Sequence, residues 1–183
     1  MISSEPTGKF VVHRRSQSTA MGILDGFFLM RIFGETTPGD IYATLECHQL
    51  IVAERPRGAV SVVAIDSTNS LPSEATRRAS VEVTKKTRLQ TLGVVIIVLG
   101  DGFWASAFRG VMTAVNLLNQ ATYPRTVVRY EEEGVDWAIE TSGERNPRYR
   151  SALLAALAEL RPIVVAHGPS MTVPTSMLST PRS

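Results

Sequence analysis

The stretch GVVIIVLGDG at residues 93–102 decides the fold class of this chain. Its apolar residues are mostly β-branched, and glycines bound the run at both ends. Runs of this kind are typical of strands that are covered on both faces, which occur mainly in parallel sheets flanked by helices. The stretch therefore predicts an α/β protein with a buried central strand at residues 94–99, and it says little about chemistry.

Length and composition favour one ordinary globular domain. The chain has 183 residues, of which 44% are hydrophobic and 20% are charged. A chain of this length can bury one well-packed core. Its 19 basic and 17 acidic residues nearly balance, so we expect no nucleic-acid partner.

Three features of the sequence favour the cytoplasm. Residues 1–6 lack the basic-then-apolar order of a secretory signal. Cys47 is the single cysteine, which excludes an internal disulfide and a cysteine-based metal cluster. No apolar stretch reaches the roughly 20 residues that a transmembrane helix needs, so we expect no transmembrane segment.

Strands and helices alternate along the expected fold. Thr37, Pro38 and Asp40 have the residue types and order of a helix start, with a capping hydroxyl, a proline in the first turn and an acid near the positive end of the helix dipole. The expected strands are residues 9–14 and 26–33, paired as neighbours across a polar turn at 16–19, then 59–65, 94–99 and 126–130. The expected helices are residues 38–53, 72–92, 102–122 and 131–139.

The carboxyl-terminal part of the chain predicts an addition to this unit. Residues 147–161 have leucines at helical spacing, which indicates an amphipathic helix. Beyond Gly168 the composition is Ser, Thr, Pro and Met without periodicity. The expected organisation is an N-terminal tail at 1–8, an α/β domain at 9–141, the additional helix at 147–161 and a disordered tail at 168–183.

The order of these elements resembles the STAS domains (sulfate transporter and anti-sigma-factor antagonist), in particular their divergent SpoIIAA-like branch. The stretches that carry the resemblance are FFLMRIFGE at 27–35, VSVVAID at 60–66, VVIIVL at 94–99 and YEEEGVDWA at 130–138. The resemblance covers about residues 9–141. It implies a β-β-α-β-α-β-α-β-α fold with a mixed, mostly parallel sheet, and a non-catalytic regulatory module that binds an anti-sigma or kinase-like protein in a bacterial cytoplasm.

The chain departs from this family at the loop that carries its phosphoswitch. Phosphorylated members have an Asp-Ser-Ser-Gly turn before the second helix, whereas residues 66–74 read DSTNSLPSE. Ser67, Ser70 or Ser73 can serve as the phosphoacceptor, since a phosphate at a helix start meets free backbone donors and the helix dipole. The alternative is that these serines are helix caps.

Asp66 follows an expected parallel strand, at the edge where α/β proteins bind ligands. It allows a phosphoryl acceptor like that of response regulators, but the acidic pair and the lysine of such a receiver are missing. The other interpretation is a turn-forming acid that accepts backbone hydrogen bonds. Cys47 and His48 are neighbours that point about 100° apart on a helix, which does not suit a nucleophile and its base. We therefore expect no enzyme activity, no cofactor and no metal site.

The helix at 102–122 carries an apolar stripe that one sheet face does not fully explain. Its members are Trp104, Phe108, Val111, Met112, Val115 and Leu118. The occupant of this stripe can be the carboxyl-terminal helix, a second copy of the chain in a homodimer, or a lipid or other small hydrophobic ligand. Ligand binding is the alternative to the protein-binding function.

Overall fold

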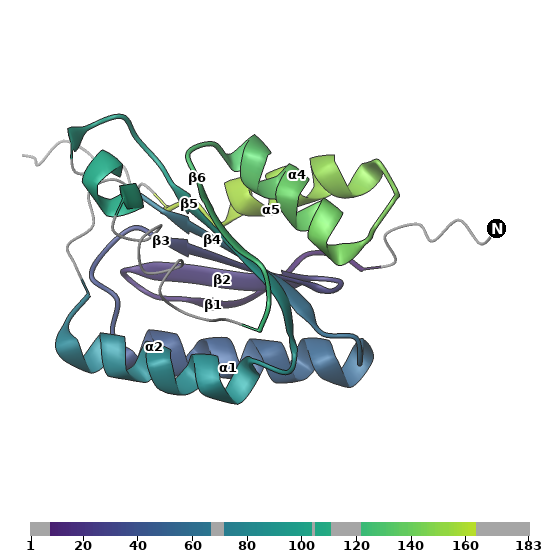
Figure 1. The fold of residues 1–183 in the computed structure, drawn as a ribbon, viewed down its shortest axis with the longest axis horizontal. Helices are drawn as coiled ribbons and strands as arrows, with labels where there is room; N and C mark the ends of the chain where they lie inside the picture. The colour runs from purple at the N-terminus through teal and green to yellow at the C-terminus, as the bar shows by residue number, and fades with distance from the viewer. Residues whose placement is uncertain (1–7, 67–71, 104, 111–121, 164–183) are drawn as a thin grey trace, which may run out of the picture.

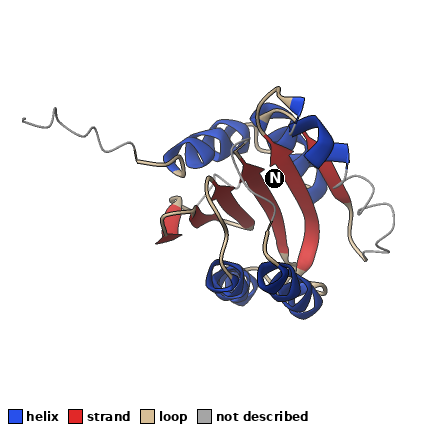
Figure 2. Ribbon diagram, turned by 90° about the vertical axis from the view of Figure 1, so that its left-hand side faces the viewer, coloured by secondary structure: helices blue, strands red, loops and turns tan. Residues whose placement is uncertain are grey.

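The computed structural model describes residues 8–66, 72–103, 105–110 and 122–163. Its helices form two layers around a six-stranded sheet (Figure 1). Helices α1 (Pro38–Glu54) and α2 (Glu74–Thr87) cover one face, and α4 (Glu131–Ser142) and α5 (Arg148–Glu159) cover the other. Figure 2 shows the sheet between these layers. The predicted α/β class with a mixed, mostly parallel sheet is confirmed.

The strands lie in the sheet in the same order as in the sequence. The first three pair antiparallel, and the pairs from the third strand to the sixth are parallel. Chain direction therefore brings the carboxyl ends of four strands to one edge of the sheet. The strands are β1 (Val11–Arg15), β2 (Thr19–Leu24), β3 (Phe27–Ile32), β4 (Ala59–Ile65), β5 (Thr91–Val98) and β6 (Arg125–Val128).

The sequence analysis missed β2, and the predicted pairing of the first and third strands is wrong. β2 lies between them and pairs with both. Its residues are nearly all buried, so it lacks the alternation that marks a half-exposed strand. A two-residue loop, Asp25 and Gly26, connects it to β3, and Asp25 has a positive φ of 52°. Asp-Gly between apolar runs is a hairpin signal that the sequence does contain.

Two helices also differ from their expected form. In α1, Ile41 and Leu45 are apolar residues at helical spacing, but they are half-buried, and the buried stripe includes Ala43, Cys47 and Ile51 instead. Helix α2 ends at Thr87 rather than near residue 92, because β5 begins at Thr91 and pairs with Ala59. The end of α2 is therefore set by the pairing of β5 with a buried neighbouring strand. The helical periodicity of the sequence does not reveal this pairing.

Helix α5 belongs to the core rather than lying beside it. Tyr149, Leu153, Leu157 and Leu160 are at most 1% exposed and pack with strand residues of β3 and β4. α5 also contacts α4 directly. Among the described residues, no helix is both long and apolar enough to cross a bilayer.

Candidate functional site

The carboxyl ends of β3, β4, β5 and β6 form one edge of the sheet, and charged and aromatic side chains gather there. Ligands of open α/β sheets bind outside this edge. We define the carboxyl-edge surface by Asp66, Asp101, Phe103, Arg129 and Tyr130, which follow β4, β5 and β6 directly or within a few residues.

A buried arginine anchors this edge. The Arg31 side chain on β3 is 8% exposed and forms two ion pairs. Its Nη2 lies 2.9 Å from Oδ1 of Asp66, and its Nη1 donates to Oε1 of Glu131 at 2.7 Å. A buried charge is costly unless paired, so these contacts hold the end of β4 against the first turn of α4. The interpretation of Asp66 as a turn-forming acid did not include this pairing with a distant strand.

The exposed part of the carboxyl-edge surface includes an ion pair and two aromatic residues. Arg129 pairs with Asp101, and its guanidinium carbon lies 5.0 Å from the centre of the Tyr130 ring. Tyr130 is 49% exposed, and Phe103, two residues beyond Asp101, is 91% exposed. Exposed large apolar groups beside an arginine are characteristic of surfaces that bind other proteins.

The loop between β4 and α2 leads from this surface to Ser73. Ser73 is exposed and is the N-cap of α2, because its Oγ accepts a hydrogen bond of 3.2 Å from the backbone N–H of Thr76. The Arg77 guanidinium lies beside it and donates to the Pro72 carbonyl at 3.1 Å. The predicted cap is thus confirmed for Ser73, while Ser67 and Ser70 lie outside the described residues.

The predicted apolar stripe of the third helix is described only in part. Residues 105–110 are helical, and Phe108 is half-buried. Trp104, Val111, Met112, Val115 and Leu118 lie outside the described residues, so a pocket between this helix and the sheet stays a prediction.

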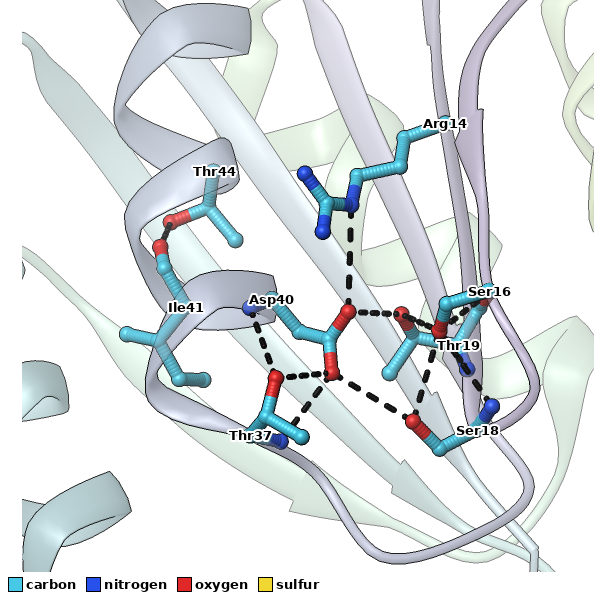
Figure 3. Close-up of polar contacts among 8 residues, drawn as sticks. All are labelled: Arg14, Ser16, Ser18, Thr19, Thr37, Asp40, Ile41 and Thr44. Carbon is cyan, nitrogen blue, oxygen red and sulfur yellow. Dashed lines mark hydrogen bonds and ion pairs between the residues drawn. The ribbon is translucent and has the colours of Figure 1, made fainter.

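Asp40 lies in a second polar cluster, at the start of α1 and beside the β1–β2 turn (Figure 3). Its carboxylate accepts hydrogen bonds from the backbone N–H and the hydroxyl of Thr37, at 3.0 and 2.7 Å, and from Ser18 and Thr19, both at 3.3 Å. Arg14 stands 3.8 Å away. Burial alone raises the pKa of Asp40, but the hydrogen bonds, first those from Thr37, bring the pKa below its usual value. The cluster is a capping box that fastens α1 to the β1–β2 turn.

His48 and Ser61 form a buried pair. Their contacts are those of a catalytic base and its nucleophile, but a substrate has no access to them. His48 Nε2 lies 3.0 Å from Ser61 Oγ, and Nδ1 lies 2.8 Å from the Thr44 carbonyl oxygen. The carbonyl can only accept, so Nδ1 carries the proton and Nε2 accepts from the serine hydroxyl. Both residues are about 5% exposed or less, which closes the pair to substrates.

Cys47 is buried in the core, and burial raises the pKa of its thiol to about 11. A thiol with this pKa is a poor nucleophile at neutral pH. In the described part of the chain, no three His, Cys, Asp or Glu residues lie together in a way that can hold a metal ion.

The sequence analysis missed most of what surrounds Asp66. Arg31, Arg129 and Tyr130 come from separate elements, and no local pattern shows that they meet. The available signal was topological, since polar residues that follow parallel strands share one edge. No protein-family model matches the chain, and a search of curated proteins finds no match to its sequence.

Proposed function

We propose that this chain is a non-catalytic regulatory module that binds a partner protein through its carboxyl-edge surface, as a divergent SpoIIAA-like STAS domain of a bacterial cytoplasm does. The observation that carries the proposal is the exposure of Phe103 and Tyr130, which lie close in sequence to the two members of the Asp101–Arg129 ion pair. The mixed sheet with helices on both faces is compatible with such a domain.

Contact with a partner would bury side chains that the isolated chain leaves in water. Removing a phenylalanine side chain from water contributes about 2 kcal/mol. Tyrosine and arginine are enriched among the residues that dominate protein interfaces. The Arg31 ion pairs hold the base of this surface in place, so little ordering cost accompanies binding.

The proposed partner binding gives the loop at residues 66–74 a regulatory role. A phosphate on Ser67, Ser70 or Ser73 would add about two negative charges to the segment that follows Asp66 in the sequence. At Ser73 the phosphate would lie at the N-terminus of α2, beside the Arg77 guanidinium. We infer that phosphorylation changes partner affinity through charge rather than through a new fold.

A photocrosslinking experiment tests the protein-binding proposal. The photoreactive residue p-benzoylphenylalanine replaces Phe103 in one variant and Leu89 in a control, because Leu89 on the α2 side is equally accessible at 84% exposure. We expect a discrete protein adduct in cells from position 103 only. Adding Arg129→Ala to the Phe103 variant should reduce the yield about tenfold, the loss typical of one interface anchor.

Two outcomes would contradict the proposal. The first is the absence of adducts at position 103. The second is the same set of adducts from positions 103 and 89, which would mean that the reagent samples abundant proteins at random. Intact-mass and peptide analysis of the same preparations tests the phosphoserine separately, since an unmodified chain that still crosslinks leaves binding in place without that switch.

A further inference from the structure

A cavity of about 290 Å³ lies at the opposite, amino-terminal edge of the parallel strands. Four segments meet there: the β2–β3 turn, the loop after α1, the start of β5 and the end of α4. The lining residues are Gly26, Phe27, Arg55, Pro56, Arg57, Gly58, Leu92, Ser142 and Glu144. The volume is just below the usual range for drug-sized ligands, so the cavity suits a smaller molecule.

One wall of this cavity is fixed by a network of charges. Arg55 Nη2 lies 3.1 Å from Asp25 Oδ1, and Nη1 donates to Glu144 Oε1 at 3.4 Å. Behind them the Tyr149 hydroxyl donates to Asp25 Oδ2 at 2.9 Å. Burial and this hydrogen bond raise the pKa of Tyr149 to about 12, so the phenol keeps its proton at neutral pH. Arg55 is therefore already paired with two carboxylates of its own chain.

The other polar side chains of the lining differ in whether their hydrogen-bonding groups already have partners. Ser142 donates its hydroxyl proton to the Ile139 carbonyl and accepts from the N–H of Glu144. Arg57 is exposed and makes no hydrogen bond or ion pair with any described residue. The cavity therefore offers one unengaged guanidinium, and a guanidinium matches the two oxygens of a carboxylate.

The rest of the lining is apolar or lacks a side chain. Leu92, Pro56 and the buried Phe27 supply the hydrocarbon part of the lining. Gly58 has a φ of +110°, and a Cβ there would lie 2.6 Å from the Gln90 carbonyl oxygen. Glycine at this position lets the loop after α1 close onto β5 and shape the cavity. A ligand that fills the cavity needs an apolar body in addition to its anionic group.

We propose that the amino-edge cavity binds a small amphipathic organic acid, with its carboxylate on Arg57 and its apolar body against Leu92 and Pro56. This site lies at the edge of the sheet opposite the carboxyl-edge surface and does not depend on the proposed protein-binding function. None of its lining residues belongs to the helix predicted at 102–122.

Two-dimensional ¹H–¹⁵N NMR with 3-phenylpropionate tests the proposal. The uncharged amide of the same acid, 3-phenylpropionamide, is the matched control ligand. We expect saturable shifts of the backbone signals of Gly26, Gly58 and Leu92 with the acid. Affinity for the amide should be at least about tenfold weaker, because a charge-assisted pair with Arg57 is lost.

Variants test whether Arg57 binds the carboxylate of the acid. Arg57→Ala should weaken binding of the acid about tenfold, and Arg57→Lys should lose less, since it keeps the charge. Arg88→Ala, an exposed arginine after α2, should leave the affinity unchanged. An unchanged urea midpoint of Arg57→Ala would show that the fold is intact. The proposal is overturned if the shifts are absent or spread over the surface, if acid and amide bind equally, or if Arg57→Ala binds like the parent chain.

Discussion

At the scale of single residues, buried polar groups in this protein serve the fold. Asp40 caps α1 and ties it to the β1–β2 turn, and His48 and Ser61 join α1 to β4. Each polar atom in these contacts has a partner, which offsets the cost of burial. We therefore assign these groups to stability, and the exposed groups at the two edges of the sheet to recognition.

The burial of His48 predicts how the free energy of unfolding depends on pH. Burial lowers the pKa of His48, so the folded chain takes up its proton less readily than the unfolded chain. The stability linked to His48 is complete above its unfolded pKa of about 6.5 and is lost as the pH falls below that value. We expect the free energy of unfolding, from urea titrations at pH 8.0 and pH 5.5, to drop more in the parent chain than in His48→Gln.

The matched control for this prediction is Gln49→Ala. Gln49 follows His48 in α1, is exposed and carries no titratable group, so this variant should keep the pH slope of the parent chain. Equal slopes in the parent and His48→Gln would mean that His48 titrates alike in the folded and unfolded chains, and would contradict its burial.

Residue-level sequence patterns predicted local contacts and missed long-range ones. The cap formed by Thr37, Pro38 and Asp40 is confirmed, because all of its hydrogen bonds lie within one turn. The partner of Asp66 was not found, because Arg31 lies on another strand and ion pairs leave no trace in local periodicity. Contacts between residues close in the sequence were therefore predictable, whereas contacts between residues far apart in the sequence were not.

At the scale of elements, the buried parallel strands were the most predictable part. The expected strand at 59–65 coincides with β4, since a β-branched run between turn residues has few alternative structures. β2 was missed although Asp25 and Gly26 mark its hairpin. Its residue Gly22 explains part of the difficulty, because glycine lowers strand propensity. A Cβ there would lie 2.5 Å from the Val11 carbonyl oxygen, so the close approach of β1 requires glycine.

Helix α5 allows a direct test of packing. Leu157 has no exposed surface and lies in the cluster formed by α4, α5 and the sheet. We expect Leu157→Ala to lower the free energy of unfolding in urea by about 3 kcal/mol, from lost burial and the remaining cavity. Leu89→Ala, at a position 84% exposed, should change it by less than about 0.5 kcal/mol. A similar small effect at Leu157 would mean that α5 contributes little to the core.

At the scale of the whole molecule, the sheet separates two helical layers and presents two different edges. The carboxyl edge combines exposed aromatic side chains with an ion pair, and the amino edge holds a cavity with a fixed charged wall. Strand direction predicts from the sequence that Asp66 lies at the first edge, but it does not predict the aromatic side chains and the ion pair found there. The sequence does not predict the second edge, because the cavity forms where helix ends and a hairpin meet.

The place of α5 in this architecture leads to the last prediction. The expected domain boundary at residue 141 implies that the chain through α4 folds alone, yet α5 buries Tyr149, Leu153, Leu157 and Leu160. Burial of four such side chains contributes about 8 kcal/mol, which is comparable to the whole stability of a typical domain. We expect a chain that ends at residue 145 to lose cooperative urea unfolding, measured by circular dichroism.

A chain that ends at residue 163 is the control, because it keeps every described residue of the helical layers. It should unfold cooperatively with a midpoint close to that of the full chain. If the chain ending at residue 145 also unfolded cooperatively, within about 1 kcal/mol of the full chain, the face of β3 that α5 covers would have to tolerate water. Phe27 and Leu29, which pack in that cluster at 1% exposure or less, make this outcome physically costly.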